Sequence, residues 1–175
     1  MQPTRKAIVL TGKLVQDHEF IYPYYRLKEE GYEVDIAVKG KVEVQGQIGC
    51  KVIPTKDIPE LKVSDYDILV IPGGAKCMEY LRQDKDAIKF IADFHAAGKV
   101  IASICHAAQM LISAKLVKGR RISGYYSIKD DIENAGGTYV DEPAVIDDRI
   151  VTTAHYKDLG PWMRASINEV ARVQG

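Results

Sequence analysis

An apolar run of strand length ends at a cysteine in the segment Val100-Ile101-Ala102-Ser103-Ile104-Cys105-His106-Ala107-Ala108. It opens the longest stretch of the chain without a charged side chain, residues 100–114, which is too short to cross a bilayer. The pattern predicts a buried strand over 100–104 that turns directly into a helix over 106–113.

The same alternation of strand and helix runs through the chain. Apolar runs at 7–10, 34–38, 68–71 and 150–153 predict further strands, and Asp17 and Asp84 are placed to cap helices that end at Gly31 and Gly98. Glycines between alternating residues over 41–53 predict a short hairpin. Fully apolar strands separated by helices are typical of a parallel sheet covered on both faces. We therefore expect one α/β domain over residues 1–175, a three-layer sandwich of the flavodoxin-like type.

Composition excludes several classes of protein. Of 175 residues, 46% are hydrophobic and 27% charged, as in ordinary globular domains, which excludes a disordered chain. Twenty-four basic residues are balanced by 24 acidic ones. A nucleic-acid binder needs an excess of Lys and Arg, and so does a protein held on an anionic membrane. We expect neither partner.

Three cysteines, Cys50, Cys77 and Cys105, have no close spacing, which argues against a disulfide framework and against zinc. No run of residues forms a secretory signal, so a reducing, cytoplasmic location is expected. Metal-ligand spacings, P-loops and dinucleotide fingerprints are missing from the sequence, and we predict no metal and no other cofactor.

Cys105 is the first candidate for catalysis. Ligands of open α/β sheets bind beyond the carboxyl ends of the strands, where Cys105 is expected. The small residues Ser103 and Ala107 flank it, as a tight nucleophile elbow requires, and the start of the following helix should favour the thiolate. The alternative is an inert core cysteine.

Other strand ends supply the remaining candidates. Gly73 and Gly74 could offer N–H groups to an oxyanion, although Gly-Gly is also an ordinary turn. Glu19 could exchange a proton with the sulfur or simply stabilise the first turn of its helix. His106 could be the base, but neighbouring residues of a helix point about 100° apart, which disfavours direct contact with Cys105. His155 follows the strand over 150–153 and could line the same crevice.

With both strand ends in view, the chain resembles the ThiJ/PfpI family, which has the class I glutamine amidotransferase-like fold. The resemblance runs over nearly the whole chain, and the spacing between its blocks matches too. The blocks are Ile68-Leu69-Val70-Ile71-Pro72-Gly73-Gly74, Ala102-Ser103-Ile104-Cys105-His106, Ile21-Tyr22-Pro23-Tyr24, Glu79-Tyr80-Leu81-Arg82, Leu111-Ile112-Ser113-Ala114, Ile128-Lys129-Asp130-Asp131 and Asp158-Leu159.

The resemblance implies a site and an activity. Cys105 would be the nucleophile, Glu19 the carboxyl that contacts it, and Tyr125 a pocket residue. Glu79 would reach the histidine of a neighbouring subunit in a homodimer or larger ring. The implied activity is that of a glutathione-independent glyoxalase or deglycase of carbonyl stress, acting on small carbonyl compounds or glycated proteins. An intracellular cysteine peptidase acting on peptides is the alternative, and a cysteine redox sensor or chaperone is a non-enzymatic one.

Residues in three segments depart from the family's pattern. Ala107 and Ala108 stand where Gly and Pro are usual, and Gln16 replaces a second acidic residue. Thr153 and Ala154 stand where many members carry Ser-Arg, so an arginine that could shape the pocket is missing. These departures leave the nucleophile unchanged and alter what surrounds the substrate.

Overall fold

A six-stranded sheet forms the centre of the molecule, in a computed structural model that describes residues 4–175. The strand order is β2-β1-β5-β6-β10-β9, and only the pairing of β10 with β9 is antiparallel. This is the mainly parallel, flavodoxin-like α/β fold expected from the apolar strands. The strands are β1 (Lys6–Leu10), β2 (Glu33–Ala37), β5 (Ile68–Ile71), β6 (Val100–Ile104), β9 (Val145–Asp147) and β10 (Ile150–Thr153).

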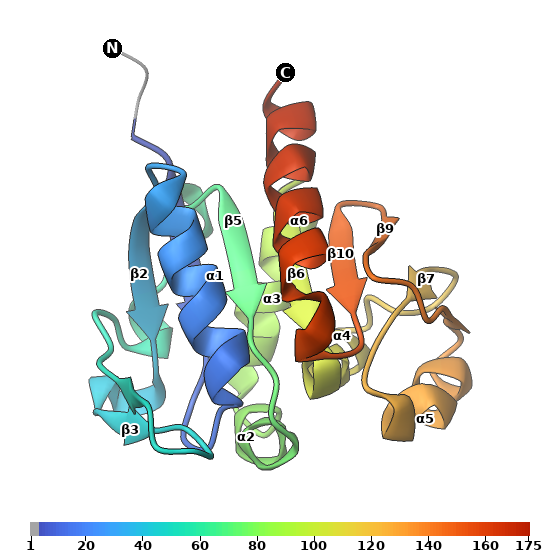
Figure 1. Cartoon of the computed structure of the whole chain (residues 1–175), viewed down its shortest axis with the longest axis horizontal. Coiled ribbons are helices and arrows are strands. Elements are labelled where there is room, and N and C mark those ends of the chain that lie inside the picture. The colour runs from blue at the N-terminus through green and yellow to red at the C-terminus, as the bar shows by residue number, and fades with distance from the viewer. Residues whose placement is uncertain (1–3) are drawn as a thin grey trace.

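Helices cover both faces of this sheet (Figure 1). Helices α1 (Asp17–Glu29) and α6 (Leu159–Gln174) pack against each other on one face, and α3 (Lys85–Ala96) and α4 (Ala108–Ser113) lie on the other. Every residue of β5 and β6 is buried, as strands covered on both sides require. The shorter elements are α2 (Ala75–Leu81), α5 (Lys129–Asn134), β3 (Val44–Gln45), β4 (Lys51–Val52), β7 (Arg121–Ile122) and β8 (Thr138–Tyr139).

The register of β5 and β6 positions the loops that follow them. Val70 pairs with Ala102 and Ile71 with Ser103, so both strands end at the same level of the sheet. The Gly73-Gly74 turn therefore lies beside the turn at Cys105. Strand β1 lies next to β5, and the loop after it leads into α1, which brings Glu19 to the same edge.

Several local expectations are confirmed and others are wrong. Asp84 caps α3 through bonds from the N–H groups of Asp86 and Ala87, and β3 and β4 form the expected hairpin. Asp17 is not the cap of α1: Gln16 is, and the Asp17 carboxylate accepts the N–H groups of Ile48 and Cys50 from the hairpin instead. These two hydrogen bonds join the start of α1 to the hairpin.

Helix α2 was not expected, because the sequence places the next cap only at Asp84. It begins directly after Gly74, whose φ of 102° is left-handed backbone that glycine tolerates. The turn thus leads straight into a helix. The backbone N–H of Gly74 lies within hydrogen-bonding reach of the Cys105 sulfur.

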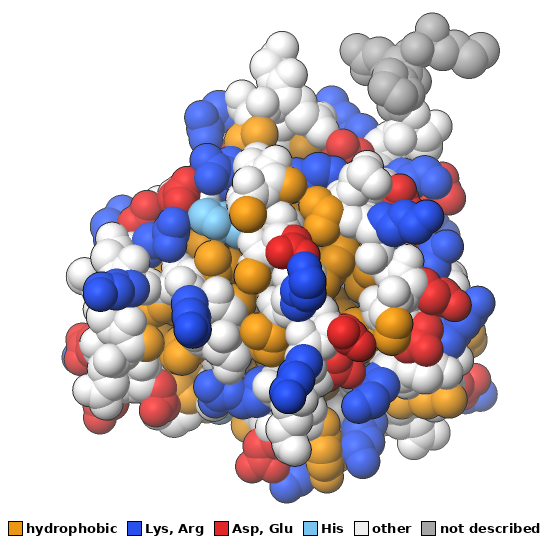
Figure 2. Space-filling model, turned by 180° about the vertical axis from the view of Figure 1, so that it is seen from behind, with side chains coloured by type: hydrophobic (Ala, Val, Ile, Leu, Met, Phe, Trp, Pro, Cys, Tyr) orange, Lys and Arg blue, Asp and Glu red, His pale blue; other side chains and the backbone are white. Residues whose placement is uncertain are grey.

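The surface agrees with the balanced composition. On the face shown in Figure 2, acidic and basic side chains are interspersed and neither sign gathers into a large patch. Among residues 4–175, no helix combines the length and apolar character needed to cross a membrane.

Candidate active site

Cys105 lies where β6 ends and a single 3-10 turn (Cys105–Ala107) leads into α4. Its φ is 61°, a left-handed conformation that costs a non-glycine residue about 1–2 kcal/mol. Ser103 and Ala107 are both buried, so the turn fits only because its flanking residues are small. Cys105 itself is 6% exposed. The structure thus places it at a strained strand-to-helix turn, as a nucleophile elbow does.

His106 contacts the sulfur directly. Its Nδ1 lies 3.3 Å from Cys105 Sγ, and its Nε2 lies 3.4 Å from Ser127 Oγ. The expectation that adjacent side chains would point apart is wrong, because it assumed helical backbone at both residues. The left-handed backbone at Cys105 turns the two side chains to the same side. Burial lowers the pKa of His106, which keeps the ring neutral and able to accept a proton.

Glu19 lies in the first turn of α1 and is fully buried. The backbone N–H of Gly73 donates to its Oε2 at 2.7 Å, while Oε1 has no hydrogen-bond partner. Burial raises the pKa of Glu19 to about 7, against the opposing effects of the Gly73 bond and of the neighbouring Cys105 thiol. Near neutral pH this carboxyl is therefore present in both its protonated and its ionised form.

The Cys105 thiol does not have the lowered pKa that the sequence led us to expect. Burial raises its pKa, and the charge of Glu19 raises it further. The N–H groups of His106 and Gly74 act in the opposite direction without cancelling these effects. A 3-10 turn followed by a six-residue helix has too small a dipole to compensate for desolvation. The resting side chain is thus the neutral thiol.

The two glycines have separate roles. Gly73 N–H already donates to Glu19, so it is not free for an oxyanion, contrary to expectation. Gly74 N–H and His106 N–H both interact with the sulfur, which leaves these two as the available donors. A Cβ on Gly73 would lie 2.8 Å from Ile104 O and 2.9 Å from Cys105 Cβ. Only glycine therefore permits this approach of the two strand ends.

Aromatic rings continue from His106 as a surface that we call the aromatic wall. Tyr125 stacks on His106 with centroids 4.7 Å apart, and its N–H donates to Cys105 O. The ring centroid of His155 lies 6.3 Å from that of Tyr125, so His155 belongs to the same group of rings. The sequence did not single out the other members, because they are scattered along the chain. The wall comprises His106, Tyr125, Tyr126, His155, Tyr156 and His18.

Glu79 is not brought to this cluster within one chain. It lies on α2 with 63% of its side chain exposed and pairs with Lys76 at 2.7 Å. Ser127, which faces His106, was missed by the sequence analysis, and no pattern in the sequence marks it. Within residues 4–175, no three His, Cys, Asp or Glu side chains are grouped as metal ligands.

Comparisons with known proteins identify the family of this chain. The model of the DJ-1/PfpI family matches residues 5–169. The chain is 40% identical to Deglycase PfpI of Pyrococcus furiosus over 159 residues, which is 91% of this chain and 95% of the relative. It is 37% identical to a Bacillus subtilis protein named "Putative cysteine protease YraA" over 166 residues, 94% of this chain and 98% of the relative. The chain also superposes on a solved two-domain protein of Anabaena variabilis that has DJ-1/ThiJ/PfpI-like and ferritin-like domains. The TM-score is 0.93 at 29% sequence identity, and the match covers 96% of this chain and 48% of the other. The chain belongs to the DJ-1/PfpI family.

Proposed function

We propose that the protein is a cysteine-nucleophile enzyme acting on carbonyl groups, of the deglycase and glutathione-independent glyoxalase type. One observation carries the proposal: the Cys105 thiol lies between a neutral imidazole at 3.3 Å and a buried carboxyl whose pKa is about 7. Such a pair of groups can take up and return protons at neutral pH. The deglycase named among the relatives supports the choice of reaction.

The first step forms the carbon–sulfur bond. Cys105 gives its proton to His106 Nδ1, and the sulfur attacks the aldehyde carbon of an α-oxoaldehyde. The C=O electron pair moves to oxygen, which the N–H groups of Gly74 and His106 stabilise before it is protonated. With methylglyoxal the product is a hemithioacetal, and no redox partner is consumed.

The second step moves a proton within the bound substrate. Ionised Glu19 removes the proton from the carbon that carries sulfur and returns it to the neighbouring carbon through an enediolate, giving a thioester. Water then cleaves the thioester, which releases lactate and restores the thiol. In a glycation adduct the carbon that is attacked has no C=O. The sulfur therefore displaces the amine or thiol from it, protonated His106 returns the proton to this leaving group, and the same hemithioacetal forms. Glu19 thus needs both of its protonation states, which a pKa of about 7 supplies.

A cysteine peptidase is the second candidate, favoured by the similarity to YraA. Peptide cleavage must protonate an amine leaving group, and a histidine does this best when a carboxylate orients it. Among the described residues, the group facing His106 Nε2 is the Ser127 hydroxyl. We infer that peptidase action requires Glu79 of a second subunit. It should then disappear in Glu79→Gln, whereas turnover of methylglyoxal by the same variant should persist.

The decisive experiment compares wild type, Cys105→Ser and Glu19→Gln on methylglyoxal, on an adduct of methylglyoxal with N-acetylcysteine, and on a peptide–coumarin substrate. Cys50→Ser is the matched control, because Cys50 lies away from the site and is half-buried. We expect kcat to fall by about 10²–10⁴-fold in both site variants on both carbonyl substrates. If the enzyme consumes the adduct no faster than the adduct releases free methylglyoxal by itself, the enzyme acts only on the free aldehyde. That result indicates a glyoxalase and excludes a deglycase. Full turnover by Cys105→Ser on all three substrates would refute the nucleophile.

A further inference from the structure

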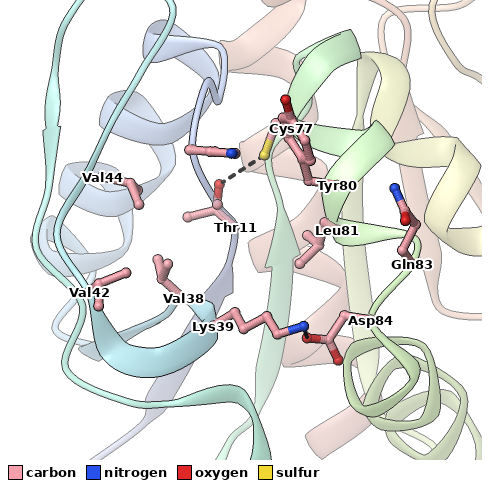
Figure 3. A pocket seen from close by; sticks show the side chains of 12 residues that line it. Thr11, Val38, Lys39, Val42, Val44, Cys77, Tyr80, Leu81, Gln83 and Asp84 are labelled. Atoms are coloured by element: carbon pink, nitrogen blue, oxygen red, sulfur yellow. Dashed lines mark hydrogen bonds and ion pairs between the residues drawn. The ribbon is translucent and has the colours of Figure 1, made fainter.

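A second pocket lies beside the active site but shares none of its groups (Figure 3). Its volume is about 380 Å³, at the lower end of the usual range for small-ligand sites, about 300–1,000 Å³. It is bordered by the segments that follow β1 and β2, by α2 and by the residues leading into and forming β3. Cys105, Glu19 and His106 do not line it.

The place of this pocket in the fold is one where α/β proteins hold ligands. The chain goes from β1 to β2 on one side and from β5 to β6 on the other, so the strand order reverses between β1 and β5. Crevices beyond the carboxyl ends of strands at such a reversal are the usual binding position. The loops after β1 and β5 reach two regions there, the active site and this pocket.

Apolar side chains form the interior of the pocket. Val38, Val42, Val44 and Leu81 converge on it from three separate segments, as Figure 3 shows. Val42 is 55% exposed, although it faces other valines. Because these side chains belong to different elements and leave an open space between them, a small apolar group could cover them.

The polar groups at the rim carry an excess of positive charge. Lys13 lies over the ring of Tyr80, 4.0 Å from its centroid, a contact that leaves its charge unneutralised. Lys39 forms a 3.7 Å ion pair with Asp84 across the mouth (Figure 3). Lys39 is 79% exposed, so this pair is weak and easily exchanged for another anion. Two ammonium groups thus face one carboxylate.

We propose that this pocket binds a small carboxylate with a short aliphatic body. The body would pack on the valines and Leu81, and the carboxylate would pair with Lys13 and Lys39. The apolar lining favours a carboxylate with an aliphatic body over inorganic phosphate, because phosphate has no apolar surface to cover the valines and Leu81. The proposal does not depend on the proposed function, since binding here requires no turnover.

The buried thiol of Cys77 offers a reporter at the floor of the pocket. It lies 4.0 Å from Thr11 Oγ1, and burial raises its pKa to about 11, so it reacts slowly with alkylating reagents. A ligand above it should slow that reaction further. The alkylation is measured in protein that carries both Cys50→Ser and Cys105→Ser, in which Cys77 is the remaining cysteine of the chain.

The test is calorimetric titration of the Cys105→Ser protein with hexanoate, hexanol, hexylamine and inorganic phosphate, alongside alkylation of Cys77. We expect saturable binding of hexanoate at least tenfold tighter than of the other three, with protection of Cys77. Lys39→Ala should weaken it several-fold and Val44→Asp should abolish it, whereas Lys62→Ala, which removes an exposed lysine elsewhere, should not change it. Equal affinity for hexanol or phosphate, or unchanged binding in both Lys39→Ala and Val44→Asp, would overturn the proposal.

Discussion

Replacing Glu19 by Gln should change how stability depends on pH. Glutamine keeps an oxygen that can accept the Gly73 N–H, and it cannot ionise. The wild-type carboxyl has its pKa raised from 4.5 to about 7 by burial. At about 1.36 kcal/mol per pKa unit, this shift changes the free energy of unfolding by about 3 kcal/mol over the whole titration. About 2.5 kcal/mol of this change occurs between pH 5 and pH 8.

The sign of this effect follows from proton binding. Between pH 4.5 and pH 7 the folded state holds a proton on Glu19 that the unfolded chain has lost. Raising the pH therefore favours the unfolded chain, and wild type loses stability over this window. The lowered pKa of His106 acts in the opposite direction, but it is common to both proteins. The difference between wild type and Glu19→Gln isolates the carboxyl.

Urea denaturation at pH 5 and pH 8 measures the free energies of unfolding. We expect wild type, relative to Glu19→Gln, to be less stable at pH 8 than at pH 5 by about 2.5 kcal/mol. Glu133→Gln, which changes an exposed acid on α5, should follow wild type at both pH values. Parallel losses in wild type and Glu19→Gln would show that Glu19 is ionised in the folded protein at pH 5, and the two-state role proposed for it would then be wrong.

Three further results are expected. Gly73→Ala should lose activity and at least 2 kcal/mol of stability, because the new Cβ would lie 2.8 Å from the Ile104 carbonyl oxygen. The control Gly160→Ala, in helix α6, should raise the melting temperature slightly. Cys105→Gly should be inactive yet about 1 kcal/mol more stable than Cys105→Ala, because φ of 61° suits glycine, and thermal denaturation measures this. Tyr126→Ala removes an exposed ring of the aromatic wall, so it should lower kcat/KM for phenylglyoxal several-fold relative to kcat/KM for methylglyoxal. The control Tyr25→Ala, on the outer side of α1, should leave this ratio unchanged.

The framework of this protein could be predicted from its sequence because it rests on patterns of hydrophobicity. Residues 68–71 are apolar throughout and residues 100–104 are apolar except for Ser103, and they form β5 and β6 over these same bounds. The cap at Asp84 needs only one side chain and the two N–H groups next to it. Such local features depend only on residues that are close together in the sequence.

Features that depend on contacts across the chain could not be predicted. Asp17 looks like a helix cap, but its partners Ile48 and Cys50 lie on a distant hairpin. The contact of His106 with Cys105 depends on a positive φ that no neighbouring residue announces. The raised pKa of the thiol depends on burial and on Glu19, which lies 86 positions earlier in the sequence. In the first and third cases the deciding partner is remote in the sequence, and in the second it is a backbone conformation that the sequence does not mark.

The active site combines three local states that are each unfavourable alone. Glu19 is a buried carboxyl with one oxygen unpartnered, Cys105 has left-handed backbone, and Gly73 leaves a gap where any other residue would have a Cβ. They are interdependent: the gap at Gly73 admits both the carboxyl and the cysteine, and the left-handed turn brings the sulfur to the imidazole. The fully buried strands β5 and β6 hold this arrangement in place, since relaxing it would separate their ends. The same burial keeps the resting Cys105 side chain a neutral thiol, and in the proposed mechanism this thiol loses its proton to the neighbouring His106.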